Sequence, residues 1–483
     1  MTTTVATPIR AEKLFAEAAQ EDPERVALIY GERTWTFAAF DAEGRRRARA
    51  LCAAALPPGA VVVAIAPLSD DLLLAWLACC HLGLIFCHLP TQYTLHEVAP
   101  LAARAAARLI LTRDGAPHPL LPALPALPLT LPGGGDTGAE LEFPQVGTPE
   151  DTAVLATTSG TTGRLPKLAI VPHRALTWRR HLPVWYEERP GVTATTTQSF
   201  KSLLRQICIA TGQRLPLLVV STLAPTKLER ELARAATQFL TIQPAILRLL
   251  TDNPQPPPPT LRLQVVRVGA APLPPTLALA AARRYGAVVS QVLSTTESGQ
   301  ILYRPELDAP EGSIGLPYPG ALVRLVDATG AEVPVGVQGE IVIQSPGLMH
   351  GYLDDPIATA DALRDGWYWT GDLAVRDPAG FYFLRGRRSL RINVNGLKVA
   401  PEEVEEVLLA HPGIREAVVL GQPDERRGER VRAIICVVGE APTTAELRRF
   451  CLARLAPYKV PQIWEYRDTL PRSPLGKVLR NQI

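Results

Sequence analysis

The sequence predicts an α/β protein with a large N-terminal domain of α/β layers that includes a β-rich subdomain, followed by a small C-terminal α+β domain. Helical stretches alternate with short apolar segments from Val61 to Val289, which is typical of a largely parallel sheet between helices. From about Gly312, apolar and polar residues alternate as in half-buried antiparallel strands. A polar junction follows. We therefore expect one domain over residues 1–385 and a second over residues 386–483.

Apolar spacing predicts the first elements. Leu14, Phe15 and Ala18 recur at helical spacing, which predicts an amphipathic helix from Arg10 to Gln20. The longest apolar run extends from Leu72 to Cys87 and is shorter than the roughly 20 residues that a membrane span requires. We expect a buried helix followed by a strand in this run.

Further strands are expected at 61–66, 323–326 and 339–343. Two proline-rich stretches, Pro117–Gly135 and Pro254–Pro259, connect predicted elements. Proline and glycine punctuate the chain at turns and loops, so both stretches are expected to cross the surface without dividing a domain.

The C-terminal domain is predicted from a hairpin signal and a helix start. Asn395-Gly396 favours a tight turn between two short apolar strands. Pro401 opens a helix, because proline suits the first helical position, and acidic residues follow it in the first turn. The remaining expected features are a buried stripe of Val404, Val407 and Leu408, strands at 417–420 and 431–438, and a helix at 445–455.

Composition limits the class of protein. The 483 residues carry a net charge of +3 without a long basic run, which disfavours a nucleic-acid partner. The 47% apolar and 20% charged residues are ordinary for a globular protein, and no secretory signal is seen near the start. The seven cysteines form no Cys-x-x-Cys pair, so we expect reduced, buried thiols in a cytoplasmic protein without a membrane partner.

The segment Thr157–Lys167 has the composition of an anion-binding loop. Its glycines allow close approach of backbone N–H groups to an anion, and its hydroxyls and lysine add donors. It follows a predicted buried strand, Ala153–Ala156. It is not a Walker A loop, because Pro166 prevents immediate continuation into a helix. On composition alone, a solvated turn is the better interpretation.

Other segments in chain order change that interpretation. They are Val268–Pro272, Leu293–Gly299, Tyr368–Asp372, Gly386-Arg387 with the later Lys398, and Pro471–Lys477. Together with the loop they resemble the ordered motifs of the adenylate-forming superfamily: acyl-CoA synthetases, adenylation domains of nonribosomal peptide synthetases, and luciferases. The resemblance spans most of the chain. It implies a large N-terminal core that binds ATP and acid, and a small, mobile C-terminal lid.

For the nucleotide, the resemblance implies a phosphate loop, a turn beside adenine, and contacts to ribose and phosphate. The phosphate loop has one more residue before Pro166 than the family pattern, and Leu293-Ser294 replaces the usual tyrosine and glycine. The implied contacts are Thr158, Ser159, Gly160, Thr161, Thr162, Gly163 and Lys167 in the loop, Gly269, Ala270, Ala271 and Pro272 at adenine, and Asp372 and Arg387.

The resemblance also implies the catalytic groups. Thr296 would touch the α-phosphate, and Glu297 would hold Mg²⁺, which prefers hard oxygen ligands. Lys477 would be the catalytic lysine of the lid. Ser389 stands at the hinge, where the family usually has aspartate or lysine.

The acid-binding residues follow from an alignment with peptide-synthetase domains. Lys201 occupies the position of an aspartate that pairs with the amine of an amino acid there. A lysine repels an ammonium, so an acid with a second acidic or hydrogen-bond-accepting group fits better. The alternative is that Lys201 points to solvent. The full set of expected pocket residues is Phe200, Lys201, Arg205, Val266, Val268, Val292, Gln300 and Ile301.

The expected reaction is attack of a carboxylate on the α-phosphorus of ATP. It gives an acyl-adenylate and pyrophosphate, and transfer to a pantetheine thiol of CoA or a separate carrier protein follows. One alternative passes the activated group to a non-thiol acceptor such as an amine, or to oxygen. Another is a non-catalytic nucleotide-binding homologue. A monomer or homodimer is expected.

Overall fold

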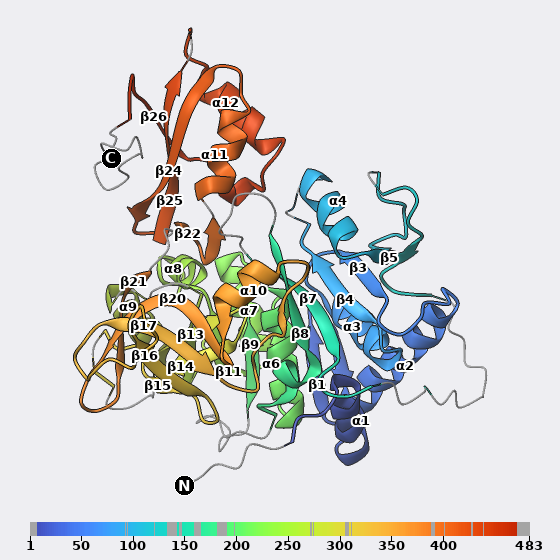
Figure 1. The fold of residues 1–483 in the computed structure, drawn as a ribbon. Coiled ribbons are helices and arrows are strands. Elements are labelled where there is room, and N and C mark those ends of the chain that lie inside the picture. Colours follow the sequence, from blue (N-terminus) through green and yellow to red (C-terminus); the bar gives the residue numbers. More distant parts are fainter. Residues whose placement is uncertain are drawn as a thin grey trace.

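The computed structural model has two parts, a large body and a smaller C-terminal part above it in Figure 1. It describes residues 7–91, 93, 95–119, 121–132, 143, 147–158, 166–180, 191–197, 199–270, 273, 275–304, 309–310, 312–387, 392–399, 401–426, 428–437 and 439–470. The phosphate-loop residues 159–165, Ala271, Pro272 and the segment with Lys477 lie outside the described residues.

The first sheet of the body has seven strands in the order β18-β8-β7-β4-β3-β5-β6. Its central strands are parallel, and β8 and β18 add an antiparallel edge. The strands are β3 (Val61–Ile65), β4 (Ile85–Leu89), β5 (Ala107–Thr112), β6 (Ala126–Pro128), β7 (Thr152–Thr158), β8 (Lys167–Pro172) and β18 (Gly351–Tyr352).

The second sheet has nine strands in the order β15-β14-β13-β12-β11-β9-β10-β1-β2, parallel except at its edges. Its strands are β1 (Val26–Tyr30), β2 (Arg33–Thr36), β9 (Val192–Thr195), β10 (Leu217–Val219), β11 (Thr237–Ile242), β12 (Val265–Val268), β13 (Val288–Thr295), β14 (Gly299–Tyr303) and β15 (Leu316–Pro317). The predicted alternation of helices and parallel strands is confirmed in both sheets.

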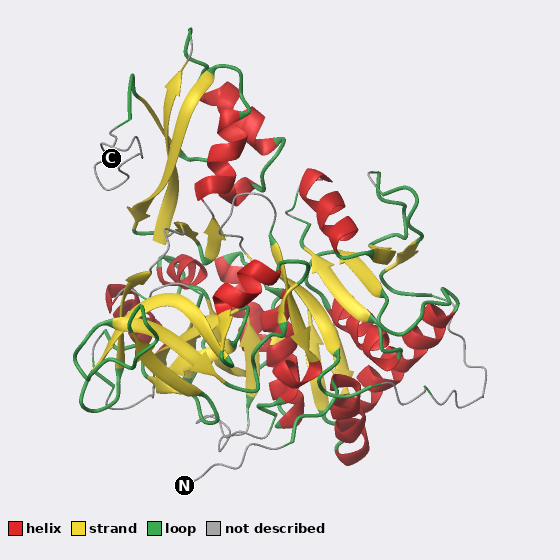
Figure 2. Cartoon of the chain, in the orientation of Figure 1, coloured by secondary structure: helices red, strands yellow, loops and turns green. Residues whose placement is uncertain are grey.

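Helices cover these sheets (Figure 2). They are α1 (Ala11–Glu21), α2 (Phe37–Cys52), α3 (Asp70–His81), α4 (Leu95–Arg104), α5 (His173–Thr177), α6 (Phe200–Gly212), α7 (Pro225–Arg234), α8 (Pro244–Thr251), α9 (Pro275–Tyr285) and α10 (Pro356–Ala362). The predicted N-terminal helix is α1, and the long apolar run is α3 followed by β4. In the described part of the chain, no helix is both long and apolar enough to cross a bilayer.

A third, antiparallel sheet completes the body, as the alternating pattern predicts. It contains β16 (Leu322–Val326), β17 (Gly339–Gln344), β19 (Leu363–Arg364), β20 (Trp367–Arg376) and β21 (Tyr382–Arg387).

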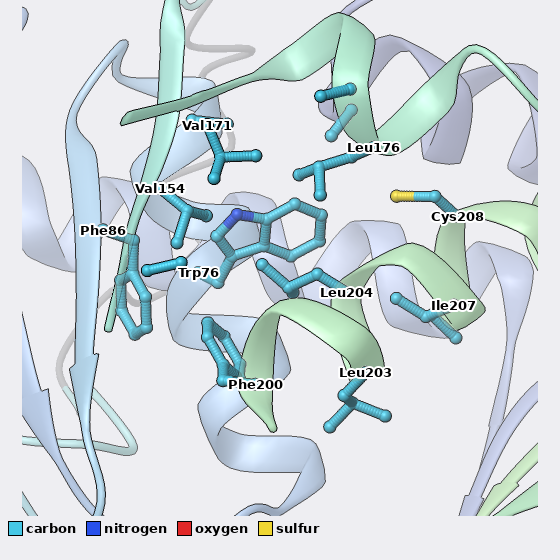
Figure 3. Packing of buried hydrophobic residues seen from close by; sticks show 14 of the residues in the cluster. Trp76, Phe86, Val154, Val171, Leu176, Phe200, Leu203, Leu204, Ile207 and Cys208 are labelled. Atoms are coloured by element: carbon cyan, nitrogen blue, oxygen red, sulfur yellow. The ribbon is translucent and has the colours of Figure 1, made fainter. Parts of the chain in front are cut away.

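The main core lies between the two large sheets and fixes α6. Figure 3 shows the indole of Trp76 on α3 surrounded by side chains that include Leu204 on α6 and Val154 on β7. Trp76 is fully buried, as is nearly every residue of α3. A helix enclosed on all sides needs no polar face, which explains why its sequence is apolar without periodicity. Six of the seven cysteines are buried; Cys52 is exposed, contrary to the expectation that all were buried.

The C-terminal part folds around its own hydrophobic core, which includes Val404 and Leu408. The predicted hairpin is confirmed, with positive φ at Asn395 and Gly396 as a tight turn between two strands requires. Its elements are β22 (Ile392–Val394), β23 (Leu397–Val399), α11 (Pro401–Leu409), β24 (Ile414–Asp424), β25 (Gly428–Val437), α12 (Thr444–Leu452), the 3₁₀ turn η1 (Pro457–Lys459) and β26 (Ile463–Tyr466).

A buried lysine joins the two parts of the molecule. Lys459 is 2% exposed, and its Nζ lies 2.9 Å from Oε1 of Glu97 on α4 and 2.6 Å from Oε1 of Glu403 on α11. Burial by itself lowers the pKa of the ammonium, but the charges of Tyr458, Glu403 and Glu97 raise it overall. The ammonium therefore remains charged and holds the C-terminal part against the body.

Replacing Lys459 should weaken the contact between the C-terminal part and the body. Lys459→Met keeps most of the side-chain volume but leaves two buried carboxylates without the ammonium between them, a loss of about 3–5 kcal/mol for a broken buried ion pair. Faster amide hydrogen exchange is expected in α4 and α11. Lys227→Met, at an exposed position on α7, is the matched control. Equal exchange in both variants would contradict the stabilising role of Lys459.

Candidate active site

The predicted site residues gather at the carboxyl ends of strands from both large sheets. Thr158 ends β7 of the first sheet, Gly269 follows β12 of the second, and Thr296-Glu297 follows β13. Ligands of open α/β sheets commonly bind at such strand ends. The sequence motifs therefore converge in space although they are far apart along the chain.

Thr158 and Lys167 mark the two ends of the phosphate loop. They are directly opposite each other in the β7–β8 pairing. Both residues are buried, at 7% and 9% exposure. The Lys167 ammonium lies 4.7 Å from the centre of the Tyr352 ring, a cation–π contact that directs it toward β18.

Tyr352 also links the two large sheets through a hydrogen bond. Its hydroxyl donates a hydrogen bond of 2.9 Å to Oε1 of Glu297, which is 5% exposed. The Met349 N–H donates to the Glu297 carbonyl oxygen at 2.7 Å. These contacts fix a buried carboxylate at the tyrosine whose ring the Lys167 ammonium contacts. Tyr352 could not be identified from the sequence, because its position depends on β18 pairing with β8, which lies far away in the sequence.

The turn after β12 has an unusual backbone. Ala270 has φ of +71°, a left-handed conformation that is uncommon for residues with a side chain. The Gly269 N–H donates to the carbonyl of Ile242 at the end of β11. A Cβ added to Gly396 would lie 3.0 Å from that of Ala270, so the C-terminal hairpin reaches this turn closely.

Asp372 lies in β20 opposite Arg387 of β21. Asp372 is 3% exposed, and its backbone N–H donates to Oγ1 of Thr370 at 3.0 Å. The preceding N–H of Gly371 donates to Oε1 of Glu340 at 2.9 Å. The turn is thus fixed by hydrogen bonds from its own backbone. A buried carboxylate at such a position is suited to accept hydrogen bonds from two neighbouring hydroxyls.

Lys201 points into the protein. The alternative that it faces solvent is wrong: it is 4% exposed, and its Nζ donates to the carbonyl oxygen of Thr296. Burial lowers its pKa to about 7, helped by the nearby Arg205 and opposed by Glu297. Helix α6 begins at the Ser199 cap, so Lys201 lies in its first turn.

Arg205 follows one helical turn later and is also 4% exposed. Burial, together with the charges of Arg179 and Arg267, lowers its pKa to about 10. Arg179, which the sequence analysis did not identify, donates to Oε1 of Gln300, and its guanidinium lies 3.9 Å from the centre of the Tyr318 ring. The expected pocket residues Lys201, Arg205 and Gln300 therefore belong to one buried cationic region.

Other expected pocket residues lie elsewhere. Val266 and Val268 belong to the core cluster on the side of α8 and α9. Arg267, whose side chain points the other way along the pleated strand, lines a cavity of about 20 Å³ together with Gln300 and residues of α6. Val266 and Val268 therefore pack in the core on one face of β12, and Arg267 lies on the other face.

Of the last three expected pocket residues, two lie in the main core and one lies near the turn after β12. Phe200 packs in the main core, its ring 5.3 Å from that of Phe86, and Ile301 is fully buried there. Val292 lies beside the turn that follows β12, because a Cβ added to Gly269 in that turn would lie 2.9 Å from Cγ2 of Val292.

Comparison with known proteins agrees with this geometry. The family model described as AMP-binding enzyme matches residues 15–353, and that of the AMP-binding enzyme C-terminal domain matches residues 403–477. A fatty acid–[acyl-carrier-protein] ligase, ScoC, of Streptomyces coeruleorubidus is 30% identical, covering 96% of this chain and 94% of its own. A sulfoacetate–CoA ligase of Cupriavidus necator is 32% identical, covering 97% and 96%.

Solved structures with the same fold cover nearly the whole chain. A double mutant of o-succinylbenzoate CoA synthetase from Bacillus subtilis, bound to a CoA product analogue, gives a TM-score of 0.88 at 26% identity, with 99% and 98% coverage. The same enzyme with its acyl-adenylate gives 0.71 at 25% identity, with 99% and 98% coverage. An amide bond synthetase, McbA, from Marinactinospora thermotolerans gives 0.87 at 27% identity, with 98% and 99% coverage.

The family models account for most of the chain, and they match both the strand-end site of the body and the C-terminal part. The chain therefore belongs to the AMP-binding enzyme family, the adenylate-forming superfamily of ligases.

Proposed function

We propose that this protein activates a carboxylic acid with ATP to an acyl-adenylate, releases pyrophosphate, and transfers the acyl group to a pantetheine thiol. The observation that carries the proposal is the Lys167–Tyr352–Glu297 arrangement, in which the ring of Tyr352 contacts a lysine at the end of the loop and its hydroxyl holds a buried carboxylate. Such a pair can grip a magnesium–nucleotide complex.

The described residues fit a magnesium ion bound together with the nucleotide phosphates. Glu297 offers one carboxylate oxygen beyond the one that Tyr352 holds, and Mg²⁺ commonly takes one or two protein carboxylates and completes its shell with phosphate and water. The ion would neutralise phosphate charge during the reaction. Thr296, whose carbonyl receives the Lys201 ammonium, lies next to this carboxylate and is proposed to face the α-phosphate.

The remaining nucleotide contacts follow the same proposal. Asp372 accepts hydrogen bonds from the ribose hydroxyls, and Gly269-Ala270 lines the adenine. The proposed contacts outside the described side chains are Ser159, Gly160, Thr161, Thr162, Gly163, Ala271, Pro272, Arg387 and Lys477.

The chemistry requires two anions to meet. The acid is ionised at neutral pH, so its carboxylate oxygen attacks the α-phosphorus directly while the bond to pyrophosphate breaks. Positioning and stabilisation of negative charge must therefore supply most of the rate gain. Lys477 of the C-terminal domain, proposed as 386–483, would add a positive charge at that centre. Thiol attack on the acyl carbonyl then releases AMP.

The relatives support a thiol acceptor. The two curated relatives named above are a ligase that uses an acyl carrier protein and a ligase that uses CoA, and each is at least 30% identical to this chain. An amine acceptor is the second candidate, because the amide bond synthetase aligns with a TM-score of 0.87. We propose CoA or a separate carrier protein as the thiol, and a cytoplasmic monomer or homodimer.

A panel of acids tests the function. ATP–pyrophosphate exchange should occur with at least one class among aliphatic, aryl, dicarboxylic and β-amino acids. AMP release that requires CoA or a carrier protein identifies the thiol acceptor, whereas release that requires an amine identifies the second candidate. Lack of exchange with every acid would indicate a non-catalytic nucleotide-binding homologue.

Replacing Lys477 should separate the half-reactions. Lys477→Ala removes the charge proposed to assist adenylation, so ATP–pyrophosphate exchange should be lost. Thiolysis of a supplied acyl-adenylate should be largely retained, because that step needs no charge at the departing pyrophosphate. Single-turnover measurements of both steps check this, and equal loss of both would reject the role of Lys477.

Replacing Tyr352 should weaken use of magnesium–ATP. Tyr352→Phe removes the hydroxyl that positions Glu297, and loss of a hydrogen bond to a charged group should raise the KM for magnesium–ATP by roughly tenfold. Tyr466→Phe, which removes a hydroxyl bonded to the Pro442 carbonyl in the C-terminal part, is the control. An unchanged KM in Tyr352→Phe would contradict the positioning role.

A further inference from the structure

We propose that the acid substrate carries a second anionic group, held by Lys201 and Arg205 on α6 and separated from the reacting carboxylate by a short spacer. This inference rests on the proposed acid-activating function and names the class of acid: a short dicarboxylic or sulfonated carboxylic acid.

Lys201 and Arg205 are buried with little neutralising charge around them. Each is 4% exposed. Among the described residues, Nε of Arg205 has no hydrogen-bond acceptor, and the charge that favours this guanidinium comes from the Tyr318 phenol. Lys201 donates to a backbone carbonyl, and its one favourable charge is Glu297. Buried charges are costly unless they are paired, so both are placed to receive an anion.

The charge around the two cations is mainly positive. Arg179 and Arg267 both oppose the positive charge of Arg205, and Arg205 opposes that of Lys201. Glu297, the acidic group that acts on Lys201, is already engaged by Tyr352 and is proposed to hold magnesium. A binding site built from such cations stabilises an anion and rejects an ammonium or a purely apolar acid.

The backbone at Gly299 leaves room for the Arg205 guanidinium. Gly299 has φ of +81°, and a Cβ added there would lie 2.6 Å from Nη1 of Arg205. Glycine at this point therefore makes room for the guanidinium beside Gln300, at the start of β14. The Arg205 head group is placed at the β13–β14 turn that also carries Thr296 and Glu297.

The position of the cations limits the length of the acid. Lys201 Nζ contacts the carbonyl of Thr296, which is proposed to face the α-phosphate. The Arg205 guanidinium lies against Gly299, three residues later in the same turn. An anionic group held by both cations therefore lies close to the reacting centre, and only a short spacer fits between it and the reacting carboxylate.

Matched acids test the inference. Malonate, succinate and sulfoacetate each have a near-isosteric monoanionic counterpart that keeps the reacting carboxylate but lacks the second charge, namely monomethyl malonate, monomethyl succinate and methylsulfonylacetate. For the wild-type protein, kcat/KM in ATP–pyrophosphate exchange should be on the order of a hundredfold higher for at least one dianion than for its counterpart, as expected for a buried charge pair. Hexanoate serves as the apolar acid.

Variants assign the preference to the two cations. Arg205→Met and Lys201→Met should lower most of the kcat/KM preference for the dianion, because the KM for the dianion rises. Arg205→Lys should retain part of this preference. Lys201→Asp should shift preference toward acids with an amino substituent. The Kd for ATP should remain unchanged in Arg205→Met. Arg230→Met, at an exposed position on α7, should behave as wild type.

The outcomes separate this inference from the proposed function. Exchange with hexanoate or the monoanionic counterparts at rates equal to those of the dianions, or an unchanged ratio in Arg205→Met, would overturn the inference and leave the function standing. A weaker Kd for ATP in Arg205→Met would assign the arginine to the nucleotide phosphates instead.

Absence of exchange with every acid would reject the proposed function, and a binding measurement then decides the inference. A dianion at 10 mM should raise the Tm of the wild-type protein more than its monoanionic counterpart does, and this difference should vanish in Arg205→Met. Equal shifts in both proteins would overturn it.

Discussion

The hydrogen bond between Tyr352 and Glu297 is the contact on which the site depends. It crosses from the seven-stranded sheet to the turn after β13 of the nine-stranded sheet, and it is buried. Because a carboxylate without donors is costly in the interior, this bond fixes how the two sheets meet at the site. The Lys167 ammonium over the same ring adds a cation, so one tyrosine organises both charges at the proposed nucleotide phosphates.

Cations in this molecule serve two different physical purposes. Lys459 is enclosed by carboxylates from both parts of the chain, and their charges raise its pKa and keep it ionised. Lys201 and Arg205 are equally buried, but their pKa values are lowered, first by burial and then by neighbouring arginines. The first arrangement stabilises a contact. The second stores unfavourable electrostatic energy, as is common where an anionic ligand binds.

Several local features could be predicted from the sequence because they depend on neighbouring residues. The α1 helix, the buried α3 and β4, and the Asn395-Gly396 hairpin follow from periodicity and turn chemistry. The ordered motifs also identified the family, which the family models confirm. Strand β12 shows the limit of such reasoning: Val266 and Val268 suit a pocket by composition, but the pleat turns them toward the core beside α8 and α9.

The sequence by itself determined the α/β class, the antiparallel section and the motif residues, because propensity, periodicity and short motifs are properties of adjacent positions. Tertiary structure alone decided that Tyr352 reaches Glu297, that Arg179 approaches Arg205 and that Lys201 faces inward. These contacts join residues separated by long stretches of chain. Their geometry comes from sheet pairing and core packing, which no local pattern encodes.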